Sequence, residues 1–244
     1  MTGSKRKKDL PDTSAVVVAA GNATRMMGIE KQLAQVDGVP VLIRSLQALA
    51  CSPSICEIIV VTREQLIPVL HQMISAFGVN KVRTILTGGA TRQQSVRKGF
   101  AQISPQGKFV AIHDGARPLV RPEEIEACIA AARRTGAAVL GTPVKDTIKQ
   151  VDGEGRVTAT PDRSALYAVQ TPQVFSSAAY GAAVEKADAA GMDFTDDCQL
   201  LEYAGMPVQV VRGSYDNIKI TTPEDLAVAE GLLAFREQWE EEVQ

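Results

Sequence analysis

Short apolar runs alternate with amphipathic stretches over the first part of the chain. Uninterrupted runs of Val, Ile and Ala predict buried strands, and apolar residues at helical spacing predict helices with one buried side. We expect strands at 15–20, 57–62, 81–86, 109–113 and 137–141, and helices at 39–50, 65–77, 91–103 and 122–134. This alternation predicts an α/β fold, a Rossmann-like and mostly parallel sheet with helices on both faces.

The alternation stops after Pro143. The following stretch is polar, and Asp152-Gly-Glu-Gly155 is typical of a turn between strands at 147–151 and 156–160. Such a hairpin has little core of its own, so we expect a protruding β-hairpin arm at about 144–171. The arm could lie on its own subunit or pack on another one.

The helical pattern returns at Ser176. A strand is expected at 208–212, and a last helix is expected to begin with Thr222 as its N-cap and Pro223 as its first residue.

Composition narrows the class of protein. The chain has 244 residues, of which 45% are hydrophobic and 22% charged, and its net charge is −2. These values exclude a disordered chain, and the near-neutral charge gives no reason to expect nucleic acid as a partner. The apolar runs are too short to cross a membrane. We expect one domain at 14–240, after a flexible basic tail at 1–13.

The cysteines and the first residues of the chain indicate the cellular compartment. Cys51, Cys56, Cys128 and Cys198 show no spacing typical of a zinc site, and a reducing compartment fits them. The basic start has no apolar stretch of the kind that a secretory signal needs. We therefore expect a cytoplasmic protein.

Three loops that follow strands carry the candidate chemistry. Since parallel strands end at one edge of a sheet, these loops should meet there. In the first, the small residues Ala19, Ala20 and Gly21 let backbone N–H groups approach phosphates, and Arg25 and Lys31 add cations. Taken alone, this loop could be only a tight turn.

The second loop contains Gly88, Gly89 and Ala90, and Ser95 follows one turn into the next helix. Paired glycines would let the main chain lie against a flat nucleotide base, although the segment could equally be an ordinary loop that ends in a helix cap.

The third loop runs from His113 through Asp114 and Gly115 to Arg117. A carboxylate at a strand end suits Mg²⁺, and Arg117 could hold an anion. Asp114 could instead cap a helix, and for His113 we expect a packed core histidine.

The loops contain cations and glycine turns but no pair of nucleophile and base. Phosphoryl and nucleotidyl transfer depend on positioning and charge neutralisation, so this set favours such a reaction. The glycine spacing matches neither the P-loop nor the dinucleotide fingerprint, which argues against a nicotinamide-dependent oxidoreductase.

In this combination the residues resemble the 2-C-methyl-D-erythritol 4-phosphate cytidylyltransferase family, over roughly 15–233. The motifs lie in order along the chain: Ala19-Ala20-Gly21, Thr24-Arg25-Met26, Lys31-Gln32, Gly88-Gly89 with Arg92 and Ser95-Val96, His113-Asp114, Ala116-Arg117-Pro118, 143–147, Thr171-Pro172-Gln173, Thr195-Asp196, 216–219 and 223–226.

The resemblance implies an activity and a set of roles. The activity is transfer of CMP from CTP to 2-C-methyl-D-erythritol 4-phosphate, with release of pyrophosphate, in the non-mevalonate isoprenoid route. The resemblance also implies Mg²⁺ or another divalent cation and a homodimer in which the arm reaches the neighbouring subunit. It assigns catalysis to Arg25, Lys31, Arg163 and Lys219; nucleotide binding to Ala19, Ala20, Gly21, Gly88, Gly89, Ala90, Ser95, Asp114 and Gly115; acceptor binding to Arg117, Thr147, Arg163, Thr171 and Thr195; and the metal to Asp114.

The chain departs from the family pattern at Ala23, Glu30 and Ala90, where a glycine, a proline and an acidic residue are usual. The alternative acceptor is ribitol 5-phosphate, which a related cytidylyltransferase would use. The alternative of another class is a catalytically silent, nucleotide-binding regulatory protein. Against the silent protein stands the presence together of Arg25, Lys31, Asp114, Arg163 and Lys219, because a protein without catalysis has no need for all five.

Overall fold

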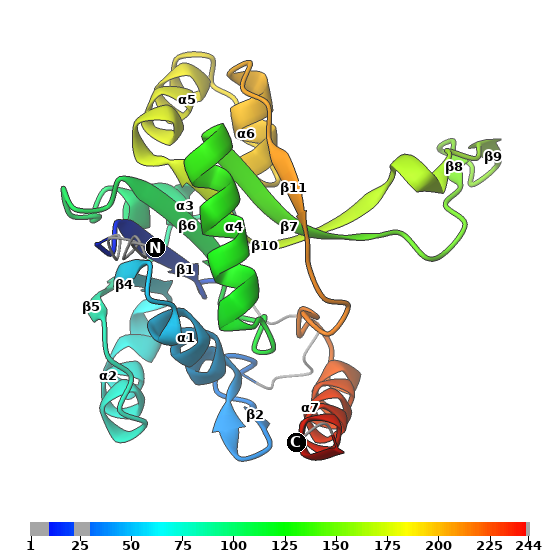
Figure 1. The fold of residues 1–244 in the computed structure, drawn as a ribbon. Coiled ribbons are helices and arrows are strands. Elements are labelled where there is room, and N and C mark those ends of the chain that lie inside the picture. The colour runs from blue at the N-terminus through cyan, green and yellow to red at the C-terminus, as the bar shows by residue number, and fades with distance from the viewer. Residues whose placement is uncertain (1–9, 22–29, 243–244) are drawn as a thin grey trace, which may run out of the picture.

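A computed structural model describes residues 10–21 and 30–242, with side chains up to Trp239. In this part of the chain seven strands form one sheet in the order β11-β7-β10-β6-β1-β4-β5 (Figure 1). Their bounds are β1 Thr13–Val18, β4 Ile55–Thr62, β5 Val82–Thr87, β6 Phe109–Asp114, β7 Ala137–Pro143, β10 Tyr167–Ser176 and β11 Gln209–Arg212.

Most neighbouring strands run parallel. β1 pairs in parallel with β4 and β6, β4 with β5, and β7 with β11. The predicted mostly parallel sheet is confirmed. The antiparallel strand β10 lies between β6 and β7 and was not predicted. Pro172 interrupts its pattern, and the β10–β7 register shifts between Val169 and Gln173, where a residue without an N–H is tolerated.

Helices cover both faces of the sheet, as predicted. Alternate residues of β1 belong to different cores: Val17 packs with α1, α2 and α4, and Val16 packs with α3, α5 and α6. Burial on both faces is the reason that the strands read as continuous apolar runs. The bounds are α1 Val41–Cys51, α2 Ile67–Ala76, α3 Arg92–Phe100, α4 Pro122–Thr135, α5 Ser177–Ala189 and α6 Asp197–Tyr203.

Several helix ends differ from the prediction. Val39–Pro40 forms the short strand β3 with β2 (Gln35–Val36), so α1 starts later than expected. A short 3-10 helix, Glu64–Leu66, precedes α2. Thr91 caps α3, since its hydroxyl accepts the N–H of Gln94 at 3.1 Å.

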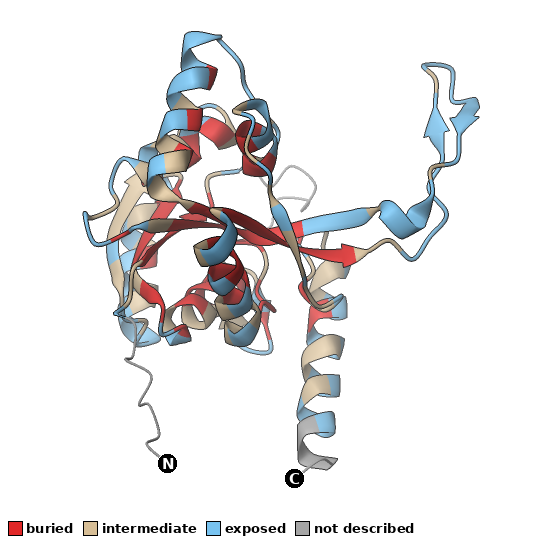
Figure 2. Cartoon of the chain, turned by 45° about the horizontal axis from the view of Figure 1, so that its top comes forward, coloured by how far each residue is buried: buried red, intermediate tan, exposed pale blue. Residues whose placement is uncertain are grey.

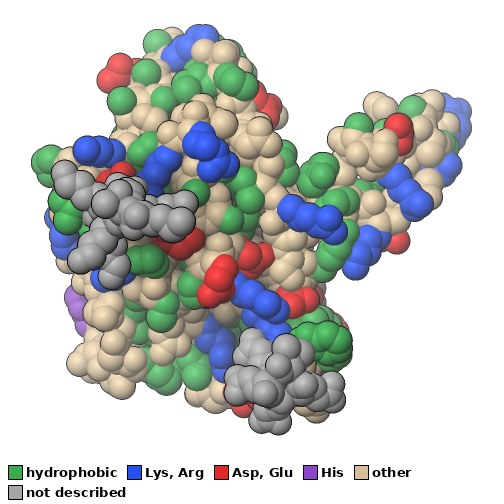
Figure 3. All heavy atoms as spheres, viewed as in Figure 1, with side chains coloured by type: hydrophobic (Ala, Val, Ile, Leu, Met, Phe, Trp, Pro, Cys, Tyr) green, Lys and Arg blue, Asp and Glu red, His purple; other side chains and the backbone are tan. Residues whose placement is uncertain are grey.

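The predicted hairpin stands out from the body as an exposed arm (Figures 1 and 2). Its strands β8 (Gln150–Val151) and β9 (Val157–Ala159) pair antiparallel and are shorter than expected. Figure 3 shows Lys and Arg side chains along this arm. At its root the Lys145 ammonium lies 3.4 Å from the centre of the Tyr215 ring, and the Tyr215 hydroxyl donates to the Pro143 carbonyl at 2.9 Å.

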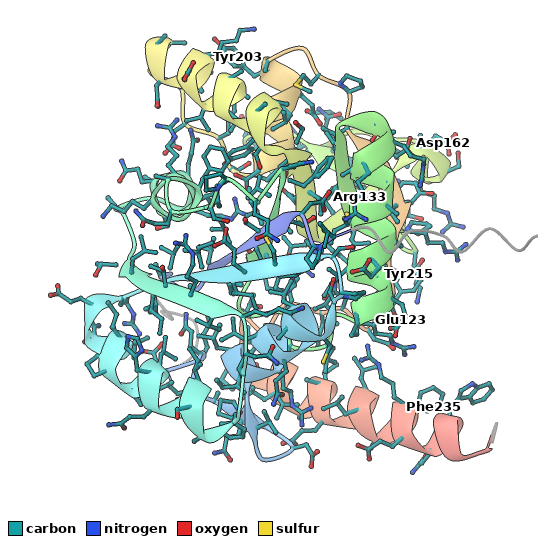
Figure 4. All side chains as sticks on the ribbon, turned by 60° about the vertical axis from the view of Figure 1, so that its left-hand side comes forward. Glu123, Arg133, Asp162, Tyr203, Tyr215 and Phe235 are labelled. Atoms are coloured by element: carbon teal, nitrogen blue, oxygen red, sulfur yellow. The ribbon has the colours of Figure 1, made fainter. Side chains whose placement is uncertain are left out.

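The last helix, α7 (Glu224–Glu242), begins one residue after the predicted start. It packs on a small core with Val36, Leu119 and Ile220. Phe235 on this helix is exposed (Figure 4). Its ring stacks with that of Trp239. None of the described helices is both long and apolar enough to cross a membrane.

Candidate functional site

A cavity of about 560 Å³ lies at the carboxyl ends of β1, β4, β5 and β6. This is the edge at which the three candidate loops were expected to meet. The predicted site residues that line the cavity are Ala19, Ala20, Gly21, Lys31, Gly88, Gly89, Ala90, Ser95, Asp114 and Lys219.

Hydrogen bonds and an ion pair hold the two ends of the first loop, at Ala19 and at 30–32. The buried Gln32 amide donates to the carbonyl of Ala19 at 2.8 Å, which places Lys31 at the cavity wall. Glu30 forms an ion pair with Arg63, another residue of the wall. Arg25 and Ala23 lie outside the described residues, so the catalytic role of Arg25 stays a prediction.

The second loop requires its glycines. A Cβ at Gly88 would lie 2.5 Å from the Ala20 Cβ and 2.8 Å from the Ser95 Oγ, so no larger residue fits between the first two loops. The Ser95 hydroxyl accepts the N–H of Gly89 and donates to the Thr91 carbonyl, both at 3.0 Å. Ser95 therefore holds the shape of this loop, and its hydroxyl proton is already used.

Asp114 lies at the centre of a group of cations. Its carboxylate is 2.7 Å from the Lys219 Nζ, 3.6 Å from the Arg92 Nε and 4.0 Å from the Arg117 Nε. Burial acts to raise the pKa of Asp114, but Lys219 and Arg92 outweigh it and lower the pKa to about 2. The carboxylate is therefore charged at any physiological pH, and it holds Lys219 at the cavity wall.

Arg92 is a functional candidate to which the sequence analysis assigned no role. It lines the cavity and connects Asp114 to the buried Asp197, whose Oδ2 accepts from Arg92 at 2.6 Å. Its position as the first residue of α3, directly after the glycine loop, was the available signal.

Behind Asp114, Thr171 and His113 form a buried layer. The Thr171 hydroxyl accepts the N–H of Asp114 at 3.0 Å and lies 3.1 Å from the His113 Nδ1. Burial lowers the pKa of His113 to about 4, so the ring is neutral. The expected packed core histidine is confirmed, while acceptor binding by Thr171 stays a prediction.

Other predicted residues do not line the cavity. Gly115 lies beneath it, where a Cβ would be 2.7 Å from the Leu42 Cδ1. The Arg117 guanidinium donates to the Asn217 carbonyl at 2.7 Å. The remaining predicted residues are exposed: Thr147 and Arg163 on the arm, and Thr195 between α5 and α6. Their assigned roles stay predictions.

Among the described residues, no three His, Cys, Asp or Glu side chains are grouped so that they could hold a metal ion. Asp114 and Glu64 are the carboxylates of the cavity wall. Mg²⁺ in phosphoryl-transfer sites is usually bound by one or two carboxylates together with substrate phosphates. A carboxylate on the cavity wall fits an ion that would arrive with a nucleotide, and metal binding by Asp114, whose carboxylate also pairs with Lys219, stays a prediction.

Comparison with known proteins agrees with this geometry. The family model for 2-C-methyl-D-erythritol 4-phosphate cytidylyltransferase matches residues 13–234. Proteins of that name from Desulforamulus reducens and Caldanaerobacter subterraneus are 43% and 46% identical, over 92% and 90% of this chain and 97% of each relative.

Solved structures agree as well. The 4-diphosphocytidyl-2C-methyl-D-erythritol synthase of Anaerococcus prevotii superposes with a TM-score of 0.81 at 34% identity, covering 91% of this chain and 96% of its own. The 2-C-methyl-D-erythritol 4-phosphate cytidylyltransferase of Thermus thermophilus gives 0.74 at 33% identity, with 91% and 98% covered. The chain belongs to the 2-C-methyl-D-erythritol 4-phosphate cytidylyltransferase family.

Proposed function

We propose that this enzyme transfers the cytidylyl group of CTP to 2-C-methyl-D-erythritol 4-phosphate and releases pyrophosphate. Membership of the family supports this activity. The observation in the molecule that carries it is the cavity at the sheet edge, which combines two close-packed small-residue loops with Lys31, Lys219 and Asp114.

The reaction needs charge control more than proton transfer. A phosphate oxygen of the acceptor attacks the α-phosphorus of CTP, a new P–O bond forms, and the bond to the bridging oxygen of the pyrophosphate breaks. The attacking phosphate is already anionic at neutral pH, so no general base is required. The buried neutral His113 is consistent with this, since it bonds inside the protein and does not line the cavity.

The two anionic substrates repel each other, and the cations of the cavity would offset that repulsion. Lys31 would face the phosphates of CTP beside the first loop. Lys219, held by Asp114 at 2.7 Å, would orient the attacking phosphate. Arg25 would add a further cation. A divalent cation bound by Asp114 would neutralise phosphate charge when CTP binds.

The arm would complete the site of a second subunit. Arg163 is exposed, its guanidinium donates to the Lys145 carbonyl at 2.8 Å, and it does not line the cavity of its own chain. The arm also exposes Val151 and Val157, which are 53% and 59% accessible. A homodimer in which the arm covers the partner would bury these side chains and bring Arg163 to the acceptor.

Thr147, Arg117, Thr171 and Thr195 would then belong to the acceptor site. A cytoplasmic location is part of the proposal, and it agrees with four cysteines that form no disulfide.

The test is pyrophosphate release from CTP and Mg²⁺, with 2-C-methyl-D-erythritol 4-phosphate and ribitol 5-phosphate offered separately. Lys219→Met is the test variant, and Lys108→Met, at an exposed position away from the cavity, is its matched control. We expect release only with the methylerythritol acceptor, in the wild type and in the control.

Release only with ribitol 5-phosphate would retain the CTP site and overturn the acceptor assignment. Absence of release with either acceptor, in protein that binds CTP, would favour the silent regulatory protein.

A further inference from the structure

The first turn of α3 holds two different segments of the candidate site. Gln94 and Ser95 bond the glycine loop that precedes the helix: the Gln94 Oε1 accepts the N–H of Ala90 at 2.9 Å, and the Ser95 Oγ accepts the N–H of Gly89 at 3.0 Å. These two side chains therefore fix the loop to which nucleotide binding is assigned.

The two preceding residues of the same turn hold the connection between α5 and α6. The Gln93 side chain is 4% exposed; its Oε1 accepts the N–H of Phe194, and its Nε2 lies 3.5 Å from the Met192 carbonyl. Arg92 donates to Asp197 at 2.6 Å. The loop with Thr195 is thus bonded to α3 on both sides of that threonine.

Asp197 is a fixed point for this connection. It is 2% exposed, its Oδ1 accepts from the Tyr180 hydroxyl at 2.7 Å, and its N–H donates to the Gln173 side chain at 3.1 Å. At the other end of the loop Met192 and Asp193 are exposed, the Met192 N–H donates to the Ala187 carbonyl at 3.0 Å, and the Phe194 ring packs on Tyr203 with ring centres 5.3 Å apart. From α3, Gln93 bonds the backbone of both Met192 and Phe194, so its side chain ties the segment just before Thr195 to the helix that carries the glycine loop.

We propose that Gln93 is a positioning residue for the acceptor substrate. One turn of α3 then aligns two segments: the glycine loop through Gln94 and Ser95, and the connection that contains Thr195 through Gln93 and Arg92. This inference rests on the proposed function, because it takes Thr195 as an acceptor contact. Coupling through one rigid turn keeps the two reacting phosphates in register, and small misplacements of reacting groups reduce rates steeply.

Two adjacent glutamines provide a matched pair of variants. Gln93→Leu removes the bonds to Phe194 and Met192, and Gln94→Leu removes the bond to Ala90. We expect Gln93→Leu to lower kcat/KM for the acceptor about tenfold while the KM for CTP stays within about twofold. Gln94→Leu should raise the KM for CTP and leave that of the acceptor unchanged. Equal effects of Gln93→Leu on both substrates, or none on the acceptor, would overturn the proposal.

Amide hydrogen exchange tests the same bonds without turnover. We expect faster exchange at Phe194 in Gln93→Leu and at Ala90 in Gln94→Leu, each without change at the other amide. Unchanged exchange at Phe194 would show that Gln93 does not hold this backbone, and would overturn the proposal even in an active enzyme. If the wild type releases no pyrophosphate with any acceptor, the proposed function and the acceptor role of Gln93 are both refuted. Exchange at Phe194 then tests only whether the Gln93 side chain holds the backbone at Phe194.

Discussion

Replacing Asp114 by asparagine should destabilise the folded protein by an amount that the surrounding cations determine. The side chain keeps its shape but loses the charge that faces Lys219, Arg92 and Arg117 within 4.0 Å. The pKa of Asp114 falls from 3.8 to about 2 in the folded protein. Since one pKa unit corresponds to about 1.4 kcal/mol, the folded surroundings, in which the cations outweigh burial, favour the charged carboxylate by a net amount of about 2.5 kcal/mol.

The free energy of unfolding of Asp114→Asn should therefore be lower by about 2.5 kcal/mol at pH 7, because asparagine leaves Lys219, Arg92 and Arg117 without the charge they face. For a chain of this length the loss corresponds to a fall in Tm of about 5–10 °C. The assay is chemical and thermal denaturation without nucleotide. Glu185→Gln, an exposed position on α5, is the matched control and should leave Tm unchanged.

The pH dependence provides the critical check. A depressed carboxyl pKa contributes stability that is present above the unfolded value, 3.8, and is lost as the pH falls towards about 2. The gap between wild type and Asp114→Asn should therefore be nearly the same at pH 7 and pH 5. A gap that is absent at pH 7, or that has vanished by pH 5, would refute the assignment of these cations to Asp114.

Three further predictions follow from other parts of the site. Lys219→Met should lower kcat/KM by about 10²–10³ with a normal circular dichroism spectrum, and near-normal pyrophosphate release would contradict its role. Mixing inactive Arg163→Ala with inactive Lys219→Met subunits should restore activity if the arm acts in the partner; a mixture that stays inactive despite subunit exchange would argue for action within one chain. His113→Gln should make the free energy of unfolding depend less on pH between pH 6.5 and about 4, because in the wild type the histidine of the unfolded chain takes up its proton first as the pH falls. Urea titrations over this range that give the same dependence of the free energy on pH for both proteins would disprove this.

Local sequence patterns were enough to predict the class of fold and the sheet edge at which the cavity lies. Strands buried on both faces read as continuous apolar runs, and this local signal placed β1, β4, β6 and β7 correctly. Small residues at the ends of β1 and β5 marked two loops of the cavity wall, because close backbone approach excludes larger side chains. Gly88, which has no room for a Cβ beside Ala20, is the clearest example.

Contacts between groups far apart in the chain could not be predicted in this way. β10 enters the sheet between β6 and β7, a pairing that no local pattern with an internal proline predicts. It brings Thr171 against Asp114, and the return of the chain after β11 brings Lys219 to the same carboxylate. The physical reason is that periodicity reports the face that a residue buries, whereas the partner of a buried charge depends on how segments far apart in the chain pack.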